Sequence, residues 1–156
     1  MRNIKIPDFP NPGKMRVFII LGWMMLVSGI SVSAQEYTLD ISVSGIHSDK
    51  GTLYLSLYNS EKGYPKDPKS AFRLVYARIT NGISTFRLDK LPKGTYAVAC
   101  YHDENGNGKL DANFFGIPTE GTGSSNNASG FLGPPKFREA KFPLDRDTAI
   151  AIRIRY

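Results

Sequence analysis

The fold is decided by the stretch Leu91-Pro92-Lys93-Gly94-Thr95-Tyr96-Ala97-Val98-Ala99-Cys100-Tyr101. A Leu-Pro-x-Gly-x-Tyr entry into a strand is typical of a tyrosine corner, in which the phenol bonds to upstream backbone and fixes a crossing between two sheets. If Tyr96 points inward, alternation along the strand also turns Val98 and Cys100 inward and places His102 at the rim of that face. The stretch therefore predicts a core strand of a two-sheet domain.

The segments on both sides of this stretch have the period of half-buried strands, because apolar and polar residues alternate along most of them. Residues 72–79 are an exception, since large side chains occupy both phases and the pattern does not define the inward face. No segment has the length and periodicity of a convincing helix. The predicted strands cover residues 37–43, 53–57, 72–79, 83–88, 97–101, 137–144 and 148–156.

Turn residues punctuate these strands. The cluster at 48–51 predicts a hairpin between the first two strands, and Asn81-Gly82 is a type I′ hairpin signal because both positions favour positive φ. The residues at 145–147 predict a last hairpin between 137–144 and 148–156. The sequence thus predicts an all-β fold, an antiparallel Greek-key β-sandwich of about seven strands with one long polar loop over 112–136.

The N-terminus has the pattern of an export signal. Lys14 and Arg16 precede an apolar run over 17–27, and Val32-Ser33-Ala34 supplies the small residues that a signal peptidase reads. The run is shorter than the roughly 20 residues that span a bilayer. We therefore expect residues 1–34 to be removed, no stable membrane span afterwards, and a single domain over 35–156 in the periplasm or outside the cell.

Charge and cysteine content exclude several classes of protein. The chain carries 20 basic and 14 acidic residues, net +6; four of the bases and one acid precede Gln35, so 16 and 13 remain, net +3. A charge this small and dispersed gives no argument for nucleic acid as a partner. The single Cys100 excludes an internal disulfide framework and is interpreted as a small buried apolar residue.

A candidate cation loop follows the decisive strand directly. In residues 103–111 the oxygen-bearing side chains recur at alternate positions, with Gly108 where a calcium loop turns sharply. A tightly curled backbone aims alternate side chains at one point, and calcium prefers six to eight oxygens. The expected metal ligands, at positions one, three, five, seven and nine, are Asp103, Asn105, Asn107, the Lys109 carbonyl and Asp111.

The loop departs from the calcium consensus at position 12, where Phe114 replaces a bidentate glutamate. Glu120 is near enough in sequence to reach back, although the spacing does not require it. With two carboxylates we expect a calcium affinity no better than about 10⁻⁴–10⁻³ M. The alternative interpretation is a plain Asn-Gly turn kept in solvent by its acids.

Other residues of the long loop are candidates for a ligand or partner surface. Phe114, Phe115 and Phe131 either pin the loop to the end of the sandwich or form a contact surface, and the length of the loop favours pinning. The polar residues suit a glycan or a protein. The predicted surface consists of His102, Phe114, Phe115, Glu120, Asn126 and Asn127.

Catalysis has weaker support. Neither Ser124 nor Ser125 lies in a Gly-x-Ser-x-Gly elbow, and the adjacent residues His102 and Asp103 point to opposite faces of a strand. The remaining catalytic hypothesis is a metal-dependent hydrolase that uses His102 and Asp103 with Asp111.

Several motifs in order resemble a bacterial secreted family called domain of unknown function 2141. They are Leu91–Val98, His102–Asp111, Gly116-Ile117-Pro118-x-Glu120-Gly121, Ser125–Ala128 and Pro135-x-Phe137-x-x-Ala140-x-Phe142. The resemblance covers about residues 37–154. It implies a compact exported β-sandwich similar to transthyretin-like and carboxypeptidase-regulatory-like domains, and it implies no activity.

Three hypotheses result from the sequence. The first is a non-catalytic exported β-sandwich whose calcium-stabilised loop presents a surface to an envelope glycan or protein. The second is a purely structural envelope domain with a solvated loop, and the third is the metal-dependent hydrolase. The sequence defines no oligomeric state.

Overall fold

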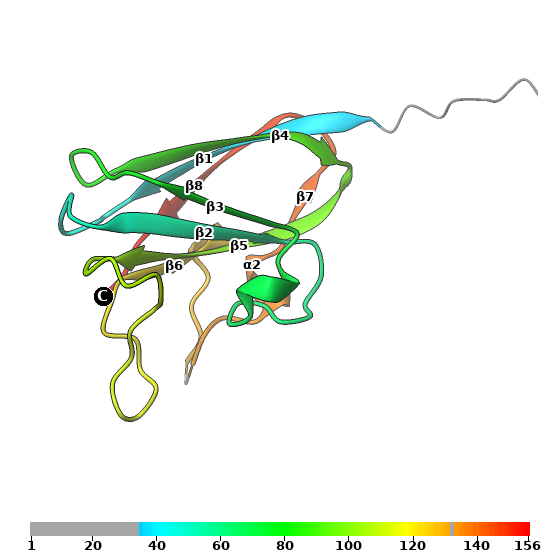
Figure 1. Ribbon diagram of the computed structural model, residues 1–156. Coiled ribbons are helices and arrows are strands. Elements are labelled where there is room, and N and C mark those ends of the chain that lie inside the picture. Colours follow the sequence, from blue (N-terminus) through cyan, green and yellow to red (C-terminus); the bar gives the residue numbers. More distant parts are fainter. Residues whose placement is uncertain (1–34, 132) are drawn as a thin grey trace, which may run out of the picture. The chain divides into compact units, whose positions relative to one another are not determined.

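The computed structural model of the protein describes residues 35–131 and 133–156 (Figure 1). The predicted signal peptide, residues 1–34, lies outside the described residues. No helix in the described part of the chain is long and apolar enough to cross a bilayer. The strands are β1 (Glu36–Ser44), β2 (Thr52–Tyr58), β3 (Arg73–Ala77), β4 (Ser84–Pro92), β5 (Gly94–Asp103), β6 (Thr122–Ser124), β7 (Phe142–Leu144) and β8 (Thr148–Arg153). The helical turns are η1 (Pro68–Ser70), η2 (Ser125–Asn127) and α2 (Phe137–Ala140).

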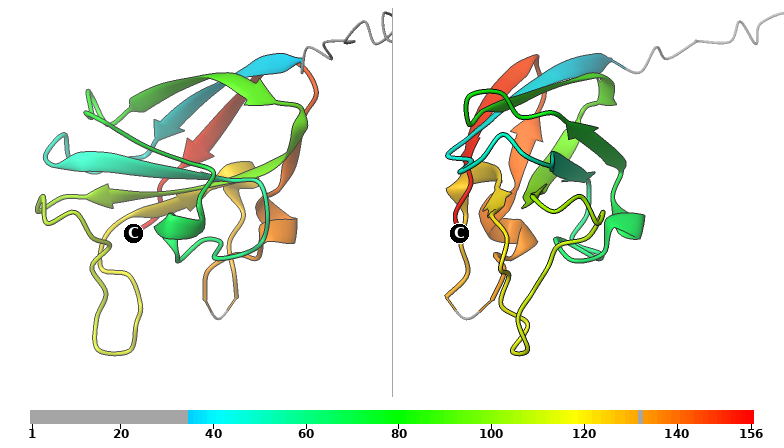
Figure 2. Two further views of the ribbon diagram at one scale, coloured as in Figure 1. Left: turned by 45° about the vertical axis from the view of Figure 1, so that its right-hand side comes forward. Right: turned by 60° about the vertical axis from the view of Figure 1, so that its left-hand side comes forward.

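The strands form two sheets that face each other (Figure 2). One sheet has three strands in the order β4-β1-β8, and the other has five, in the order β3-β2-β5-β6 with β7 also paired to β5. The prediction of an all-β domain is therefore confirmed. The prediction that all pairs are antiparallel is wrong, because β1 runs parallel to β8. The Greek-key order stays a prediction.

Three turns predicted as hairpins connect strands in different sheets. β1 pairs with β4 and β8 and not with β2, so the connection over 45–51 crosses the core. The 145–147 turn likewise connects β7 and β8 in opposite sheets, so both predicted hairpins are wrong. At Asn81-Gly82 the turn itself is present, with φ of 53° and 71°, but its arms diverge after a single bridge between Thr80 and Ile83. Turn chemistry permits a reversal of the chain without deciding whether the arms bond each other.

The β1–β2 connection and the Asn81-Gly82 turn are joined at one end of the domain. The carboxylate of Asp49 accepts hydrogen bonds from the backbone N–H groups of Asn81 and Gly82, each at 2.8 Å. These bonds, the one from Gly82 first, lower the pKa of Asp49. Asp49 therefore ties the β1–β2 connection to the β3–β4 turn.

Two local predictions in the C-terminal third are also wrong. Residues 137–140 form the turn α2 and not a strand, because the N–H of Lys136 donates to the Glu139 carboxylate at 2.8 Å and begins a helix there. The polar stretch 112–136, predicted as loop, contains the short strand β6 and the turn η2. Both additions pack against the outer part of β5 and help to define the base of the site.

One hydrophobic core lies between the sheets, and its members come from both. The predicted inward faces of β1, β2, β4 and β8 are confirmed by their buried aliphatic residues. In β3 the smaller Val75 and Ala77 face the core, while Leu74 and Tyr76 are exposed. The core residues are Leu39, Ile41, Val43, Ile46, Leu53, Leu55, Leu57, Ile79, Phe86, Leu88, Leu91, Tyr96, Val98, Cys100, Phe142, Leu144, Ile152 and Ile154. The chain from Ala34 to Tyr156 forms one compact unit, and this core lies within it, as expected of a domain.

The tyrosine corner is confirmed. The Tyr96 hydroxyl donates to the Pro92 carbonyl at 2.9 Å, and the side chain is buried. The bond spans the point where the chain leaves β4 in one sheet and enters β5 in the other. Val98 and Cys100 are buried as the alternation predicts, so the corner also sets the position of the loop that follows β5.

Candidate functional site

The candidate site is the loop over 104–121, which leaves β5 and returns to β6 (Figure 1). Its two arms are bonded at three levels: the N–H of His102 donates to the Gly121 carbonyl, the N–H of Thr119 donates to the Asp111 carbonyl, and Ala112 forms a bridge with Pro118. The loop is therefore a narrow projection with a paired base.

Asp103 organises the first turn of this loop from inside the domain. Its side chain is 1% exposed, and its carboxylate accepts hydrogen bonds from three consecutive backbone N–H groups, those of Gly106, Asn107 and Gly108, at 2.8–3.1 Å. Gly106 and Gly108 have positive φ, which aims these N–H groups inward. A buried carboxylate thus satisfies the amides of the curled segment.

Glu120 reaches back from the returning arm and closes the base. One carboxylate oxygen accepts from the N–H of Glu104 and the other from the N–H of Asp111, both at 3.0 Å. Its side chain is buried, so the prediction that Glu120 belongs to a partner surface is wrong. The residue instead joins both ends of the segment over 104–111.

The remaining predicted ligands gather on the outer side of the same turn. The Nδ2 atoms of Asn105 and Asn107 donate to the Asp111 carboxylate at 2.6–3.0 Å. Their Oδ1 atoms accept the N–H groups two residues further on, those of Asn107 and Lys109. Asp103 and Asp111 therefore both contact Asn107, and the structure brings all five predicted residues into one turn.

This donor set fits a hard cation only in part. Two carboxylates, two amides and a backbone carbonyl within nine residues have the oxygen chemistry that calcium selects. Phe114, at the twelfth position, is 97% exposed and supplies no oxygen. No group of three or more His, Cys, Asp or Glu side chains among the described residues is arranged for a metal, so a cation here depends on amide and carbonyl oxygens.

His102 does not face the loop exterior. It is fully buried, Nε2 lies 2.7 Å from the Lys50 carbonyl, and Nδ1 lies 2.7 Å from the hydroxyl of Tyr156. Since a carbonyl only accepts, Nε2 carries the proton and Nδ1 accepts from Tyr156. The placement of His102 at the rim and on a partner surface is wrong, and both ring nitrogens are already bonded. Asp103 bonds to different groups, so the residues of the hydrolase hypothesis do not converge.

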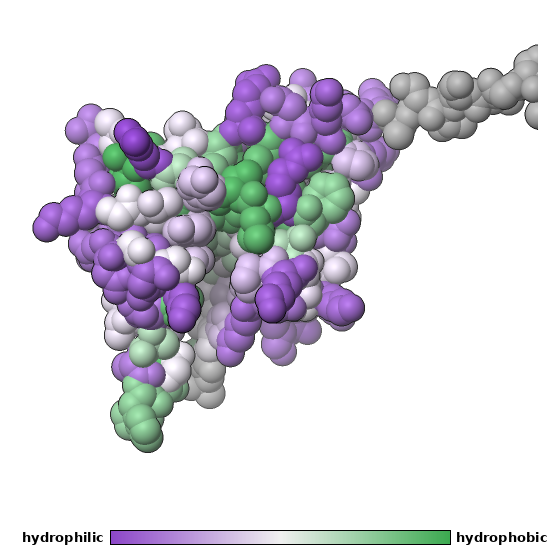
Figure 3. Space-filling model, in the orientation of Figure 1, coloured by the Kyte–Doolittle hydropathy of each residue, from purple (hydrophilic) through white to green (hydrophobic). Residues whose placement is uncertain are grey.

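The tip of the loop is apolar and exposed. Phe114 and Phe115 are 97% and 82% exposed, and their rings form an edge-to-face pair with centroids 5.5 Å apart. Ile117 is exposed beside them. Phe131, in the next loop, is 98% exposed. The prediction that these phenylalanines pin the loops to the domain is wrong; they form exposed surface instead (Figure 3).

The polar run after β6 has a structural role that the sequence did not reveal. Ser125 is fully buried; its hydroxyl accepts from the Val98 N–H and donates to the Ala140 carbonyl at 2.6 Å. Asn126 donates to the carbonyls of Glu139 and Lys141, and the side-chain oxygen of Asn127 accepts from the Arg153 N–H. These amides are engaged with backbone, which weakens their predicted role in binding a ligand.

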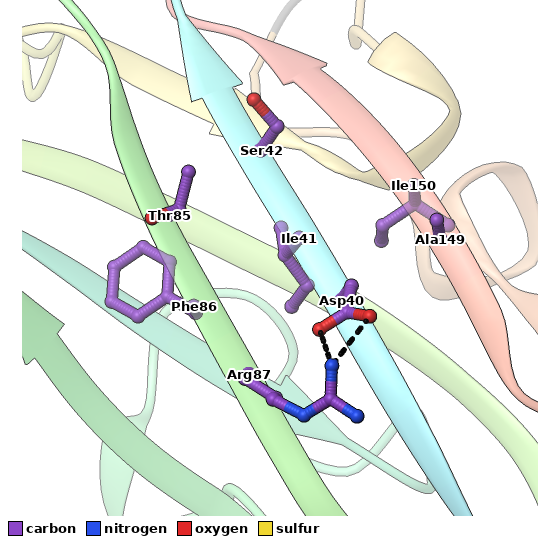
Figure 4. A pocket seen from close by; sticks show the side chains of 8 residues that line it. All are labelled: Asp40, Ile41, Ser42, Thr85, Phe86, Arg87, Ala149 and Ile150. Atoms are coloured by element: carbon purple, nitrogen blue, oxygen red, sulfur yellow. Dashed lines mark hydrogen bonds and ion pairs between the residues drawn. The ribbon is translucent and has the colours of Figure 1, made fainter.

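Two further features of the described residues, a shallow groove and the thiol of Cys100, do not form a reactive site. A shallow groove crosses β4, β1 and β8, and its charged residues, Arg87 and Asp40, form an ordinary cross-strand ion pair at 3.2 Å (Figure 4). Cys100 is buried, and burial raises the pKa of its thiol to about 12. The thiol therefore stays protonated at neutral pH, as the interpretation of Cys100 as an apolar residue requires.

Comparison with known proteins gives one family. The family model described as "Uncharacterized protein conserved in bacteria (DUF2141)" matches residues 41–151, which is more than half of the chain and includes the whole loop. No curated protein and no solved structure matches the chain.

Proposed function

Because the chain belongs to the bacterial DUF2141 family, whose description assigns no activity, we propose a function from the loop itself: non-catalytic binding in the cell envelope. The domain is exported, residues 1–34 are removed, and the loop over 104–121 presents its tip to an envelope partner. The sandwich serves as the rigid support.

One observation carries this proposal: two of the most exposed apolar side chains, Phe114 and Phe115, stand on a loop whose base is held by buried carboxylates. Asp103 and Glu120 are buried and together accept five backbone N–H groups of the loop. A binding element that is ordered beforehand loses less entropy on association. Phe114 and Phe115 are exposed at the end of this loop. Covering them with another surface removes apolar area from water and therefore favours binding.

The chemistry of the tip favours an apolar partner over a glycan. The asparagines that suited a sugar, Asn126 and Asn127, bond to backbone of the domain itself. The tip offers aromatic and aliphatic surface instead, from Phe114 to Ile117. Such a surface is recognised by burial of apolar area.

A cross-linking experiment tests the proposed binding role. A photo-reactive phenylalanine analogue at position 115 should form adducts with envelope material, whereas the same analogue at Tyr76, exposed on β3 and separated from β5 by β2, should not. Equal adduct yields at both positions, or none at position 115, would contradict a role for the tip.

We propose further that calcium stiffens the turn. Asp103, Asn105, Asn107, Asp111 and the Lys109 carbonyl would hold the ion, which would supply positive charge between two carboxylates. This assignment is supported by the gathering of the five residues in one turn, in which both carboxylates contact Asn107. With calcium ten-fold above a Kd of about 10⁻⁴–10⁻³ M, linkage raises the melting temperature of residues 35–156 by about 5 °C over a chelator control.

The Asp111→Asn variant is the matched control for calcium, since it keeps the shape of the side chain and removes its charge. It should lose the calcium response and keep the melting temperature in chelator. A shift below about 1 °C in the unmodified chain would exclude calcium. That result would favour a plain turn, which has support of its own because Asp103 and Glu120 already satisfy the amides of the turn.

A further inference from the structure

We infer that the apolar partner is a lipid bilayer with anionic headgroups, and that the domain docks on its surface through Phe114, Phe115 and Phe131. This inference rests on the proposed binding role of the loop and names the chemistry of its partner. It adds a second contact, Phe131, which belongs to a different loop.

The three phenylalanines stand on projections that point the same way. The loop over 104–121 and the segment that carries Phe131 extend from the same side of the domain in all three views (Figures 1 and 2). Phe114 and Phe131 are 97% and 98% exposed, so neither contributes to the core. Two separate apolar tips on one side form two points of contact with an extended surface.

The shape of these tips suits a bilayer better than a folded partner. None of the three phenylalanines lines the groove across β4, β1 and β8 or the groove between residues 61–67 and 134–137. A protein would need two preformed pockets at matching positions to cover both tips. The interface of a bilayer accepts separate aromatic side chains without any pocket, to a depth of about 5–10 Å.

Basic residues gather on the body of the domain, whereas the loop over 104–121 itself carries three acids, one of them the buried Glu120, against Lys109. The segments 59–70 and 134–141 lie against each other on this side and carry six basic side chains against three acidic ones. Two of the acids, Asp67 and Glu139, are bonded to neighbouring residues within these segments. No lysine there forms an ion pair with another described residue. The basic side chains are Lys62, Lys66, Lys69, Lys136, Arg138 and Lys141.

The segments 59–70 and 134–141 therefore give the body of the domain charge complementarity with anionic lipid. A basic side chain near such a membrane contributes about 1 kcal/mol, and apolar insertion adds to it. Because either contribution alone gives weak attachment, aromatic tips backed by basic residues are the combination that a reversible membrane contact requires. The paired base of the 104–121 loop holds Phe114 and Phe115 away from the body, where they can enter the lipid.

The test uses the chain over 35–156 and vesicles of phosphatidylethanolamine and phosphatidylglycerol in equal parts. The unmodified chain should sediment with these vesicles and less with phosphatidylcholine alone. The Phe114→Ser/Phe115→Ser variant should bind about ten-fold more weakly or worse, and Phe131→Ser should also bind more weakly. Because all three side chains are exposed, unchanged melting temperatures verify that the variants fold.

Fluorescence locates the contact. The one tryptophan of the chain, Trp23, precedes Gln35, so Phe115→Trp places a single reporter at the tip of residues 35–156. Its emission should shift to the blue on addition of the anionic vesicles. Tyr76→Trp, on the exposed face of β3, is the matched control and should show no shift.

Three results would overturn the inference: no binding to the anionic vesicles, equal binding by the Phe114→Ser/Phe115→Ser variant, or no blue shift at position 115. If cross-linking at position 115 then yields protein adducts, the proposed binding role stands and only the lipid is wrong. If cross-linking fails as well, both proposals fail.

Discussion

At the scale of single residues, the end of β5 contains two buried polar side chains that are fully bonded. Asp103 faces the loop amides, and His102 bridges the Lys50 carbonyl and the Tyr156 hydroxyl. No buried side-chain nitrogen or oxygen among the described residues lacks a partner. Removing one member of such a network leaves the other desolvated and unbonded, which costs more than the bond contributes.

Asp103→Ala should lower the free energy of unfolding by about 2–4 kcal/mol, because three backbone N–H groups lose a charged acceptor at a buried position. Urea unfolding measures the loss, and hydrogen exchange at Gly106 and Gly108 should become faster. Asp111→Ala, whose partners are exposed side chains, should cost less than about 1 kcal/mol. Equal losses would mean that Asp103 does not organise the turn.

Tyr156→Phe should lower the free energy of unfolding by about 1–2 kcal/mol. It removes the donor to His102 Nδ1 and the acceptor of the His47 N–H, while the stacking of His47 on the ring, 3.6 Å between centroids, is kept. Tyr76→Phe is the control, because that side chain is exposed and should give a change within about 0.5 kcal/mol. A neutral Tyr156→Phe would contradict the bonding assigned to His102.

The site illustrates which residues sequence reasoning can find. Alternate oxygens in 103–111 mark the curled turn, because its ligands are adjacent in the chain. The hydrogen-bond partner of His102, Tyr156, lies 54 residues away in the sequence, and no local sequence pattern predicts this contact. Burial of Glu120 and exposure of Phe114 are equally tertiary properties: a loop with phenylalanines is expected to pack them unless something outside the domain covers them.

At the scale of elements, the longer strands were predictable, whereas the short strand β6 and the pairing partners were not. Alternation in β1, β2 and β8 identifies an inward face, and the Leu-Pro-x-Gly-x-Tyr entry identifies the crossing into β5. The residues at 48–51 and 145–147 permit a reversal with either outcome, a hairpin or a crossing between sheets. Which of these outcomes occurs depends on which strands pair with each other, and strand pairing is decided by the packing of the whole domain.

Two glycines with the same backbone conformation should respond differently to alanine. Gly51 and Gly108 have φ of +73° and +75°, but a Cβ at Gly51 would collide with the Asp103 carbonyl, whereas one at Gly108 meets no atom within 4 Å. Gly108→Ala should therefore cost only backbone strain, about 1 kcal/mol. Gly51→Ala should cost about 3 kcal/mol or more, because β2 must also move away from β5. Similar losses in urea unfolding would contradict this packing of the β1–β2 connection against β5.

At the scale of the whole molecule, alkaline pH should destabilise the domain. Burial raises the pKa of Cys100 and of Tyr64 to about 12, and it raises the pKa of Tyr58 and Tyr96. A group whose pKa is higher in the folded state stabilises the fold fully below its unfolded pKa and loses that contribution as the pH rises. Urea midpoints should be constant near neutral pH and fall above about pH 9. The Tyr64→Phe variant should show a smaller decrease of the urea midpoint with rising pH. A midpoint of the unmodified chain that stays constant up to about pH 11 would contradict the predicted alkaline destabilisation.

The three-stranded sheet places the beginning of the domain beside its end. β1 lies between β4 and β8, so the first strand of the described residues acquires its second neighbour only from the last of them. A nascent chain that stops before Thr148 has no Ile152 or Ile154 to complete its interior, and one flank of β1 has no strand beside it. β1 therefore acquires both of its neighbours only once β8 has been synthesised, and until then a cell has to handle this part of the polypeptide as an open chain.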